Sequence, residues 1–169
     1  FMWETAKGAK QVRKHTHTNG TADNFYKLNE GNVSVIHFAT HGFFETTRTA
    51  INLPALKGRF SPMDLSGIVM SNGNHGWLYG SPMQHEGVLT ASDISKMNLK
   101  DTSLVVLSVC NSGNGTVRSD ELYGLQRAFK KAGVKTIIMS LWNESDEVGA
   151  MFMTKLYYHL LFDELSIID

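Results

Sequence analysis

Two apolar, strand-like runs constrain the fold of this chain more than any other feature of the sequence. The first, residues 33–40, leads directly into His41 and Gly42, and the second, residues 104–109, leads into Cys110. Continuous apolar runs of this length are typical of buried parallel strands. In an open α/β sheet, ligands bind at the carboxyl ends of such strands. We therefore expect a thiol and an imidazole at one edge of a sheet, where they could act as a nucleophile and its base.

The rest of the sequence predicts alternating helices and strands. The predicted helices cover residues 3–14, 22–28, 91–97, 121–132 and 146–162, and two further predicted strands cover 65–70 and 135–141. Thr90 and Asp93 have the spacing of a capping box at the start of one helix, although Asp replaces the preferred Glu or Gln. Continuous apolar strands that alternate with helices predict an α/β fold with a mostly parallel central sheet and helices on both faces.

The composition of the 169 residues is that of one soluble globular domain. Sixteen basic residues balance sixteen acidic ones, so the charge gives no reason to expect contact with nucleic acid or an anionic membrane. No apolar run approaches the ~18 residues of a membrane span. A lone cysteine cannot form an internal disulfide, which fits the reducing cytoplasm. The chain begins without Met and ends in an apolar tail, so we expect it to be a fragment of a longer protein.

Cys110 and the histidines each have a simpler interpretation beside the catalytic one. A free cysteine is often a small buried hydrophobe, but His41 at the matching point of the other strand favours a nucleophile and its base. His37 lies inside its apolar run, between Ile36 and Phe38, so we interpret it as a hydrogen-bonded core residue. Two histidines without a carboxylate cluster do not indicate a metal site, and we expect neither a metal nor a cofactor.

The segment after the third strand carries a tryptophan and several acidic residues. Trp142 could pack in the core or line a substrate cleft. Glu144, Asp146 and Glu147 form a local acidic cluster at the predicted start of the last helix. Carboxylates at this position stabilise a helix through its dipole, but in a partly dry cleft they also select for an arginine or lysine side chain. Both interpretations are open at this point.

Four segments of the sequence, in this order, resemble the CHAT domain, the bacterial branch of the caspase-like cysteine peptidases that also include separases and gingipains. Each segment is a weak signal alone, but their order along the chain is highly specific. The segments are residues 37–44, 87–91, 106–113, and 124–133 running on to 140–142. The resemblance covers residues 33–160 and implies one domain, over residues 1–169, with a caspase-like three-layer α/β sandwich.

The resemblance also implies a catalytic mechanism. His41 would be the base and Cys110 the nucleophile of a dyad that cleaves peptide bonds through a thioester. The backbone N–H groups of Gly42 and Cys110 would hold the oxyanion. In separases, an acidic residue after the corresponding Leu-Trp strand binds an arginine at P1, the substrate residue before the cleaved bond. By alignment this residue is Asp146 here, with Glu144 as the alternative, and cleavage is expected after Arg in preference to Lys.

Three functions therefore compete. The first is a cysteine endopeptidase that acts on a protein partner, and Arg118, in the loop that leaves Cys110, would suit it as a site of self-cleavage. The second is a non-catalytic caspase-like scaffold that only recruits partners, and the third is a thiol hydrolase of small esters or amides. CHAT domains often follow tetratricopeptide repeats, which would lie upstream of Phe1 and could select the substrate, and an activating partner is also conceivable.

Overall fold

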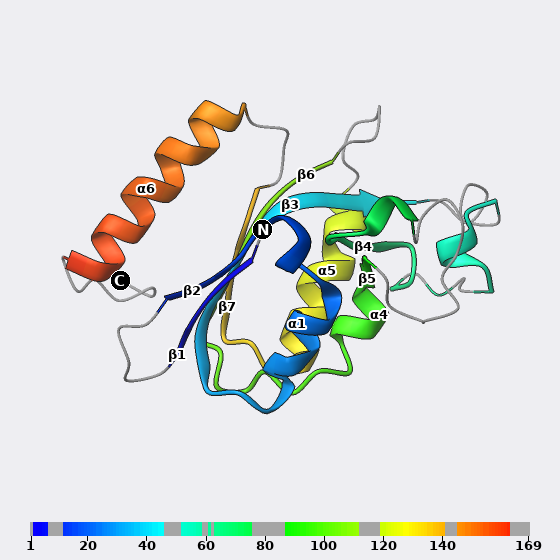
Figure 1. The fold of residues 1–169 in the computed structure, drawn as a ribbon, viewed down its shortest axis with the longest axis horizontal. Helices are drawn as coiled ribbons and strands as arrows, with labels where there is room; N and C mark the ends of the chain where they lie inside the picture. The colour runs from blue at the N-terminus through cyan, green and yellow to red at the C-terminus, as the bar shows by residue number, and fades with distance from the viewer. Residues whose placement is uncertain are drawn as a thin grey trace.

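The computed structural model describes residues 2–6, 12–45, 52–58, 61, 63–75, 87–111, 119–140 and 145–162. A seven-stranded sheet lies at the centre of the described residues (Figure 1). Its strands are β1 (Met2–Ala6), β2 (Val12–His15), β3 (Val33–Phe44), β4 (Ser66–Val69), β5 (Val88–Thr90), β6 (Leu104–Asn111) and β7 (Thr136–Met139).

Helices connect and flank these strands. The α-helices are α1 (Ala22–Tyr26), α4 (Ala91–Ile94), α5 (Ser119–Ala132) and α6 (Asp146–Phe162), and short 3-10 helices cover His17–Asn19, Lys27–Glu30 and Pro54–Leu56. Helix α1 begins where the Thr21 side chain accepts a hydrogen bond from the backbone N–H of Asn24, as its position before the helix predicts. Helix α5 ends at Gly133, whose φ of 104° favours glycine.

Strand β3 organises the sheet, because three other strands pair with it. β6 runs parallel to β3 from Val35 to Gly42 and occupies one edge of it, and β7 pairs in parallel with the far side of β6. β1 pairs antiparallel with the first half of β3 and β4 with its last four residues. Since β6 already covers one edge, β1 and β4 follow one another along the opposite edge.

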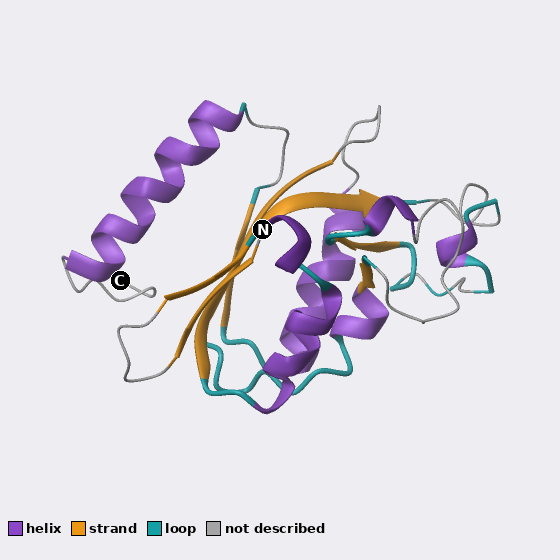
Figure 2. Cartoon of the chain, viewed as in Figure 1, coloured by secondary structure: helices purple, strands orange, loops and turns teal. Residues whose placement is uncertain are grey.

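Helices lie on both sides of this sheet, as predicted (Figure 2). On one side, Phe38 of β3 contacts Phe25 of α1 and Phe129 of α5, with ring centroids 5.4 Å and 6.0 Å away. This side holds the main apolar core. On the other side, His37 of β3 contacts Tyr157 of α6. Alternate residues of β3 therefore contact helices on opposite faces, as the two-residue period of a strand requires.

The prediction of a mostly parallel sheet is wrong. Among the described strands, only β3–β6 and β6–β7 pair in parallel, whereas β1–β2, β1–β3, β3–β4 and β4–β5 are antiparallel. The antiparallel strands come from two hairpin-like pairs, β1–β2 and β4–β5. Neither pair has the long continuous apolar run that identified β3 and β6, so the sequence pattern predicted β4 but not its antiparallel pairing, and it missed β1, β2 and β5.

The predicted helix over residues 3–14 is also wrong, because the described residues of this segment, 3–6 and 12–14, belong to the strands β1 and β2. The apolar residues at helical spacing were few, and Gly8 inside the segment weakens a helix by about 1 kcal/mol relative to alanine. Pairing of β1 with the free edge of β3 satisfies the backbone groups of both strands. This long-range pairing outweighs the weak local preference for a helix.

The other predicted helices, and the predicted strands over residues 65–70 and 135–141, are confirmed with small shifts. The Thr90 side chain accepts a hydrogen bond from the backbone N–H of Asp93, and the Asp93 carboxylate accepts one from the backbone N–H of Thr90. The predicted capping box is thus present, with Asp in place of Glu. Strands β4 and β7 and helices α5 and α6 lie within the predicted segments or within two residues of them.

Replacement of Gly67 by alanine is expected to destabilise the fold by about 2–3 kcal/mol, the cost of overpacking a filled core. A Cβ at position 67 would overlap the carbonyl oxygen of Leu89 in β5 and lie 2.5 Å from the ring of Phe43. The backbone of β5 cannot move away without breaking its pairing with β4. Urea unfolding of Gly67→Ala against the wild type measures the difference.

Gly31→Ala is the matched control, because a Cβ there would meet its nearest neighbours at 3.6 Å, an ordinary contact, and its φ of −97° suits any residue. We expect this variant to remain within about 0.5 kcal/mol of the wild type. Equal stabilities for the two variants would contradict the tight contact between β4, β5 and Phe43.

Candidate active site

The pairing of β3 with β6 brings the predicted nucleophile and base together. His41 and Cys110 are direct register partners on these neighbouring parallel strands. Paired positions of adjacent strands share one face of a sheet, and strands lie about 4.8 Å apart. The backbone positions of His41 and Cys110 are therefore adjacent across the two strands, on one face of the sheet. The two residues, far apart in the sequence, thus meet at the carboxyl end of β6, which stops at Asn111.

His41 lies within β3 and not beyond its end, because the strand continues to Phe44. The prediction that the strand stops before His41 is wrong, since β4 pairs with residues 41–44 and extends it. The His41 side chain is nevertheless exposed. Next to it, the Thr40 hydroxyl donates a 2.6 Å hydrogen bond to the carbonyl of Val69 in β4. The backbone that carries the imidazole is therefore held from both sides, while the ring itself is open to solvent.

Gly42, the proposed oxyanion donor, is buried in the same stretch of β3. Its register partners are Asn111 of β6 and Ile68 of β4. A Cβ at position 42 would lie 3.4 Å from the Cβ of Val109, an ordinary contact on the side of the sheet that holds the main apolar core, opposite to His41.

Several predicted site residues lie outside the described part of the structure. Trp142, Glu144 and Arg118 are among these. For Cys110 and Asp146 the structure gives the backbone, which places the first in β6 and the second at the start of α6. Their roles remain predictions.

The N-terminus of α6 is built by a residue that the sequence analysis did not single out. The backbone N–H of Val148 donates to the Ser145 hydroxyl, and the N–H of Gly149 donates to the Ser145 carbonyl. Ser145 thus caps the helix, and Asp146 is its first residue. An acidic residue at this position interacts favourably with the helix dipole whatever else it does. The helix follows the end of β7, and its N-terminus lies at the upper end of the sheet in the view of Figure 1.

His37 is the hydrogen-bonded core histidine that the sequence predicts. Its side chain is 7% exposed, and its Nε2 lies 3.0 Å from the hydroxyl of Ser108 in β6. The ring of Tyr157 in α6 stacks on it, with centroids 5.6 Å apart and an angle of 28° between the planes. Burial lowers the pKa of His37 to about 4 and raises the pKa of Tyr157 to about 12, so both groups are neutral at pH 7.

The cluster of His37, Ser108 and Tyr157 is on the same face of the sheet as His41. Positions 37 and 41 of β3 share a face, and Ser108 reaches His37 from the neighbouring strand. Sequence reasoning identified His37 but missed the other two residues. The available signal was Ser108, a polar residue inside the most apolar strand.

Lowering the pH from 7 to 4 is expected to destabilise the fold through His37. The unfolded chain binds a proton on this residue near pH 6.5, whereas the native state resists protonation down to about pH 4. The contribution of neutral His37 to the free energy of unfolding is therefore fully present above pH 6.5, and it is lost as the pH falls toward 4. At about 1.4 kcal/mol per pKa unit the loss is about 2–3 kcal/mol.

The measurement is the free energy of unfolding at several pH values for the wild type and for His37→Gln, which cannot titrate. The difference in the free energy of unfolding between the two proteins should change by about 2–3 kcal/mol between pH 7 and pH 4. A constant difference over this range would contradict the native pKa assigned to His37.

The described residues offer neither a metal site nor a membrane span. No group of three or more His, Cys, Asp or Glu side chains in this part of the chain could hold a metal ion. No helix in the described ranges combines the length and apolar character needed to cross a bilayer.

Comparison with known proteins places these observations in context. A family model described as "CHAT domain" matches residues 4–164. Tetratricopeptide repeat protein 28 of Mus musculus is 38% identical over 80 residues, which are 47% of this chain and 3% of the mouse protein. The Homo sapiens protein of the same name is 35% identical over 80 residues, with the same shares. The chain therefore matches only a small part of these relatives. No solved structure gives a significant match.

Proposed function

Because the chain belongs to the CHAT domain family, we propose that it is a cysteine endopeptidase that cleaves a protein partner after a basic residue. The observation that carries this proposal is the register of β3 and β6, which pairs an exposed histidine with the only cysteine of the chain. A thiol needs a nearby base to act as a nucleophile at neutral pH. We also propose that the α/β fold is the three-layer sandwich of the caspase-like peptidases.

In the proposed mechanism, His41 removes the proton of the Cys110 thiol, and the thiolate attacks the carbonyl carbon of the substrate peptide bond. The backbone N–H groups of Gly42 and Cys110 stabilise the oxyanion that forms. His41 then gives the proton to the leaving amine, the C–N bond breaks, and a thioester remains. A water molecule deprotonated by His41 attacks this thioester, which releases the new carboxyl end and restores the thiol.

Specificity in this proposal comes from the segment that leads into α6. Asp146, or alternatively Glu144, would pair with the side chain at P1, and Trp142 would line the cleft. A carboxylate can bind the planar guanidinium through two parallel hydrogen bonds, whereas the ammonium of lysine offers a single point charge. Arginine should therefore be preferred to lysine. Arg118 satisfies the same preference and is the proposed site of self-cleavage.

The names of the relatives and the need for a free thiol extend the proposal to partners and location. Both relatives carry a name that refers to tetratricopeptide repeats. We propose that such repeats, or an activating partner, present the protein substrate to this domain. The nucleophile must remain a free thiol, so we place the enzyme in the reducing cytoplasm.

A fluorogenic peptide library varied at P1 tests the proposal. The protein should cleave after Arg most rapidly, after Lys more slowly, and after neutral residues least. If no peptide is cleaved and Cys110 fails to react with an arginine-based electrophile, the scaffold function would replace the peptidase. Faster hydrolysis of small esters than of any basic peptide would favour a thiol hydrolase instead.

A further inference from the structure

The proposed chemistry does not use the buried contact between β3 and α6. Here the ring of Tyr157 stacks on His37, and His37 in turn lies within hydrogen-bond distance of Ser108. We propose that Tyr157 and His37 form an anchor that fixes α6 on the sheet and thereby positions Asp146, the first residue of this helix, relative to the candidate dyad. This inference rests on the proposed function, because it concerns how the specificity segment of that site is held.

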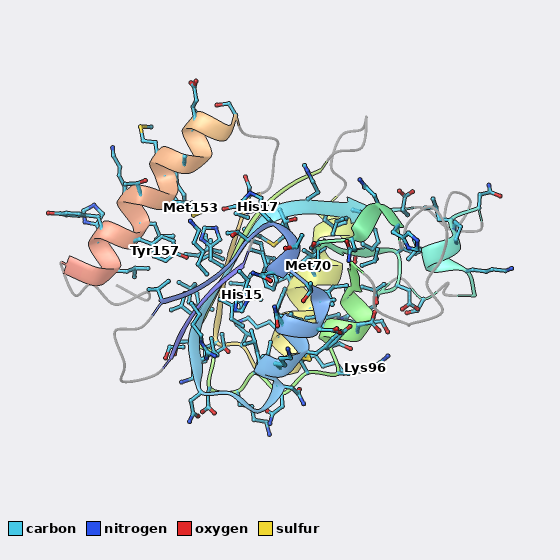
Figure 3. All side chains as sticks on the ribbon, viewed as in Figure 1. His15, His17, Met70, Lys96, Met153 and Tyr157 are labelled. Carbon is cyan, nitrogen blue, oxygen red and sulfur yellow. The ribbon has the colours of Figure 1, made fainter. Side chains whose placement is uncertain are left out.

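The anchor matters because α6 packs loosely. None of the side chains from residue 147 to residue 160 is fully buried, whereas α5 buries Leu125, Ala128 and Phe129 completely. Figure 3 shows the Tyr157 side chain on the side of α6 that faces the strands, together with Met153. The opposite side of the helix is exposed. A helix with so few buried contacts depends strongly on each one.

The sheet side of the contact is rigid. His37 is buried in the central strand, and the Ser108 hydroxyl at its Nε2 restricts rotation of the imidazole ring. Both residues belong to the two strands that carry His41 and Cys110. The ring that Tyr157 contacts is therefore part of the same framework as the proposed dyad, so the anchor ties α6 directly to that framework.

The distances along the two elements let the anchor act on the site. From Tyr157 back to the first residue of α6 is roughly 16 Å at 1.5 Å per residue. From His37 forward to His41 is roughly 13 Å at 3.3 Å per residue. The start of α6 and the dyad are thus at similar distances from the anchor, toward the same end of the sheet. A helix is stiff over this length, so a shift at Tyr157 moves Asp146 relative to the dyad.

The test compares Tyr157→Ala with Tyr157→Phe and with Tyr158→Ala, in the full chain. Tyr158 is the matched control because it is the next residue of the same helix but is 55% exposed. For an arginyl peptide, Tyr157→Ala should raise KM about tenfold with kcat within about twofold, because the dyad is unchanged while the substrate is held less well. Tyr157→Phe and Tyr158→Ala should remain within about twofold of the wild type in both constants.

Two activity-independent measurements accompany the kinetics. The rate at which iodoacetamide, a small uncharged reagent, alkylates Cys110 should be equal in all variants. Hydrogen exchange of the backbone amides of residues 145–157 should be faster in Tyr157→Ala alone. The inference would be overturned if Tyr157→Ala had the same KM and the same exchange rates as the wild type. It would also be overturned if Tyr158→Ala changed both quantities as much as Tyr157→Ala does.

The anchor and the proposed function fail separately. A wild type that cleaves no peptide would contradict the function, but the exchange comparison would still decide whether Tyr157 holds α6. If Tyr157→Ala does not fold, Tyr157→Leu preserves apolar bulk without an aromatic ring. Exchange in Tyr157→Leu that is as slow as in the wild type would show that ring stacking does not fix the helix, and would overturn the inference.

Discussion

Replacement of Cys110 by alanine is expected to abolish peptide hydrolysis, with a fall in kcat of at least about 10⁴-fold. The thiolate forms the covalent bond of the thioester, and no other side chain can substitute for it, because the chain has no second cysteine. His41→Ala should lower kcat by about 10³–10⁴-fold, since the thiol loses its base and the leaving amine its acid. Initial rates with the best arginyl peptide measure both effects.

The two dyad variants should not be additive, because each removes a part of the same catalytic unit. The double variant is expected to be about as inactive as Cys110→Ala alone. His159→Ala is a suitable control, since this histidine is exposed on α6. Cys110→Ala protein that retained hydrolysis would exclude this cysteine as the nucleophile. A fall of less than tenfold in His41→Ala would exclude a histidine base at this position.

The centre of the sheet and the pairing of the candidate dyad were predictable because their signals are local and strong. The apolar runs of β3 and β6 have no competing helical period, and parallel strands bring their carboxyl ends to one edge. His41 and Cys110 were therefore expected at one edge of the sheet, and close together if the two strands were neighbours. Their direct register, however, comes only from the structure.

The antiparallel parts of the sheet were not predictable in the same way. β5 has three residues, too few for a periodic signal. The hairpin-like pair β1–β2 is stabilised by pairing with β3, more than 20 residues away in the sequence, and local propensity carries no information about such contacts. The extension of β3 to Phe44 has the same cause. In the sequence, Gly42 indicates the end of the strand, and only the long-range pairing with β4 shows that the strand continues.

The anchor shows a third kind of limit. His37 could be assigned to the core from its apolar neighbours, but its partner Tyr157 lies at the other end of the chain. A tyrosine in an apolar helix does not reveal which strand residue it will contact. Side-chain contacts between distant elements depend on how the helix is placed on the sheet, and this placement is a property of the whole fold.

Replacement of Asp146 by asparagine is expected to remove the preference for basic residues at P1. A carboxylate that pairs with the substrate guanidinium in a partly dry cleft contributes strongly to binding, so kcat/KM for arginyl peptides should fall by about 10²–10³-fold. Peptides with a neutral P1 residue make no such pair, so kcat/KM for these peptides should change by less than about threefold. The measurement is kcat/KM over a matched set of Arg, Lys and norleucine peptides.

The position of Asp146 also offers a purely structural role, and the same variants separate the two. Asp146 is the first residue of α6 after the Ser145 cap, where a negative charge interacts with the helix dipole and stabilises the helix by about 0.3–1 kcal/mol. In that case Asp146→Asn would lower stability slightly and leave the P1 preference unchanged. Glu147→Gln, at the next and exposed position, is the matched control for the dipole effect. If Glu144→Gln and not Asp146→Asn removes the preference for arginine, the P1 carboxylate is Glu144, and the segment before α6, rather than the helix itself, binds the substrate.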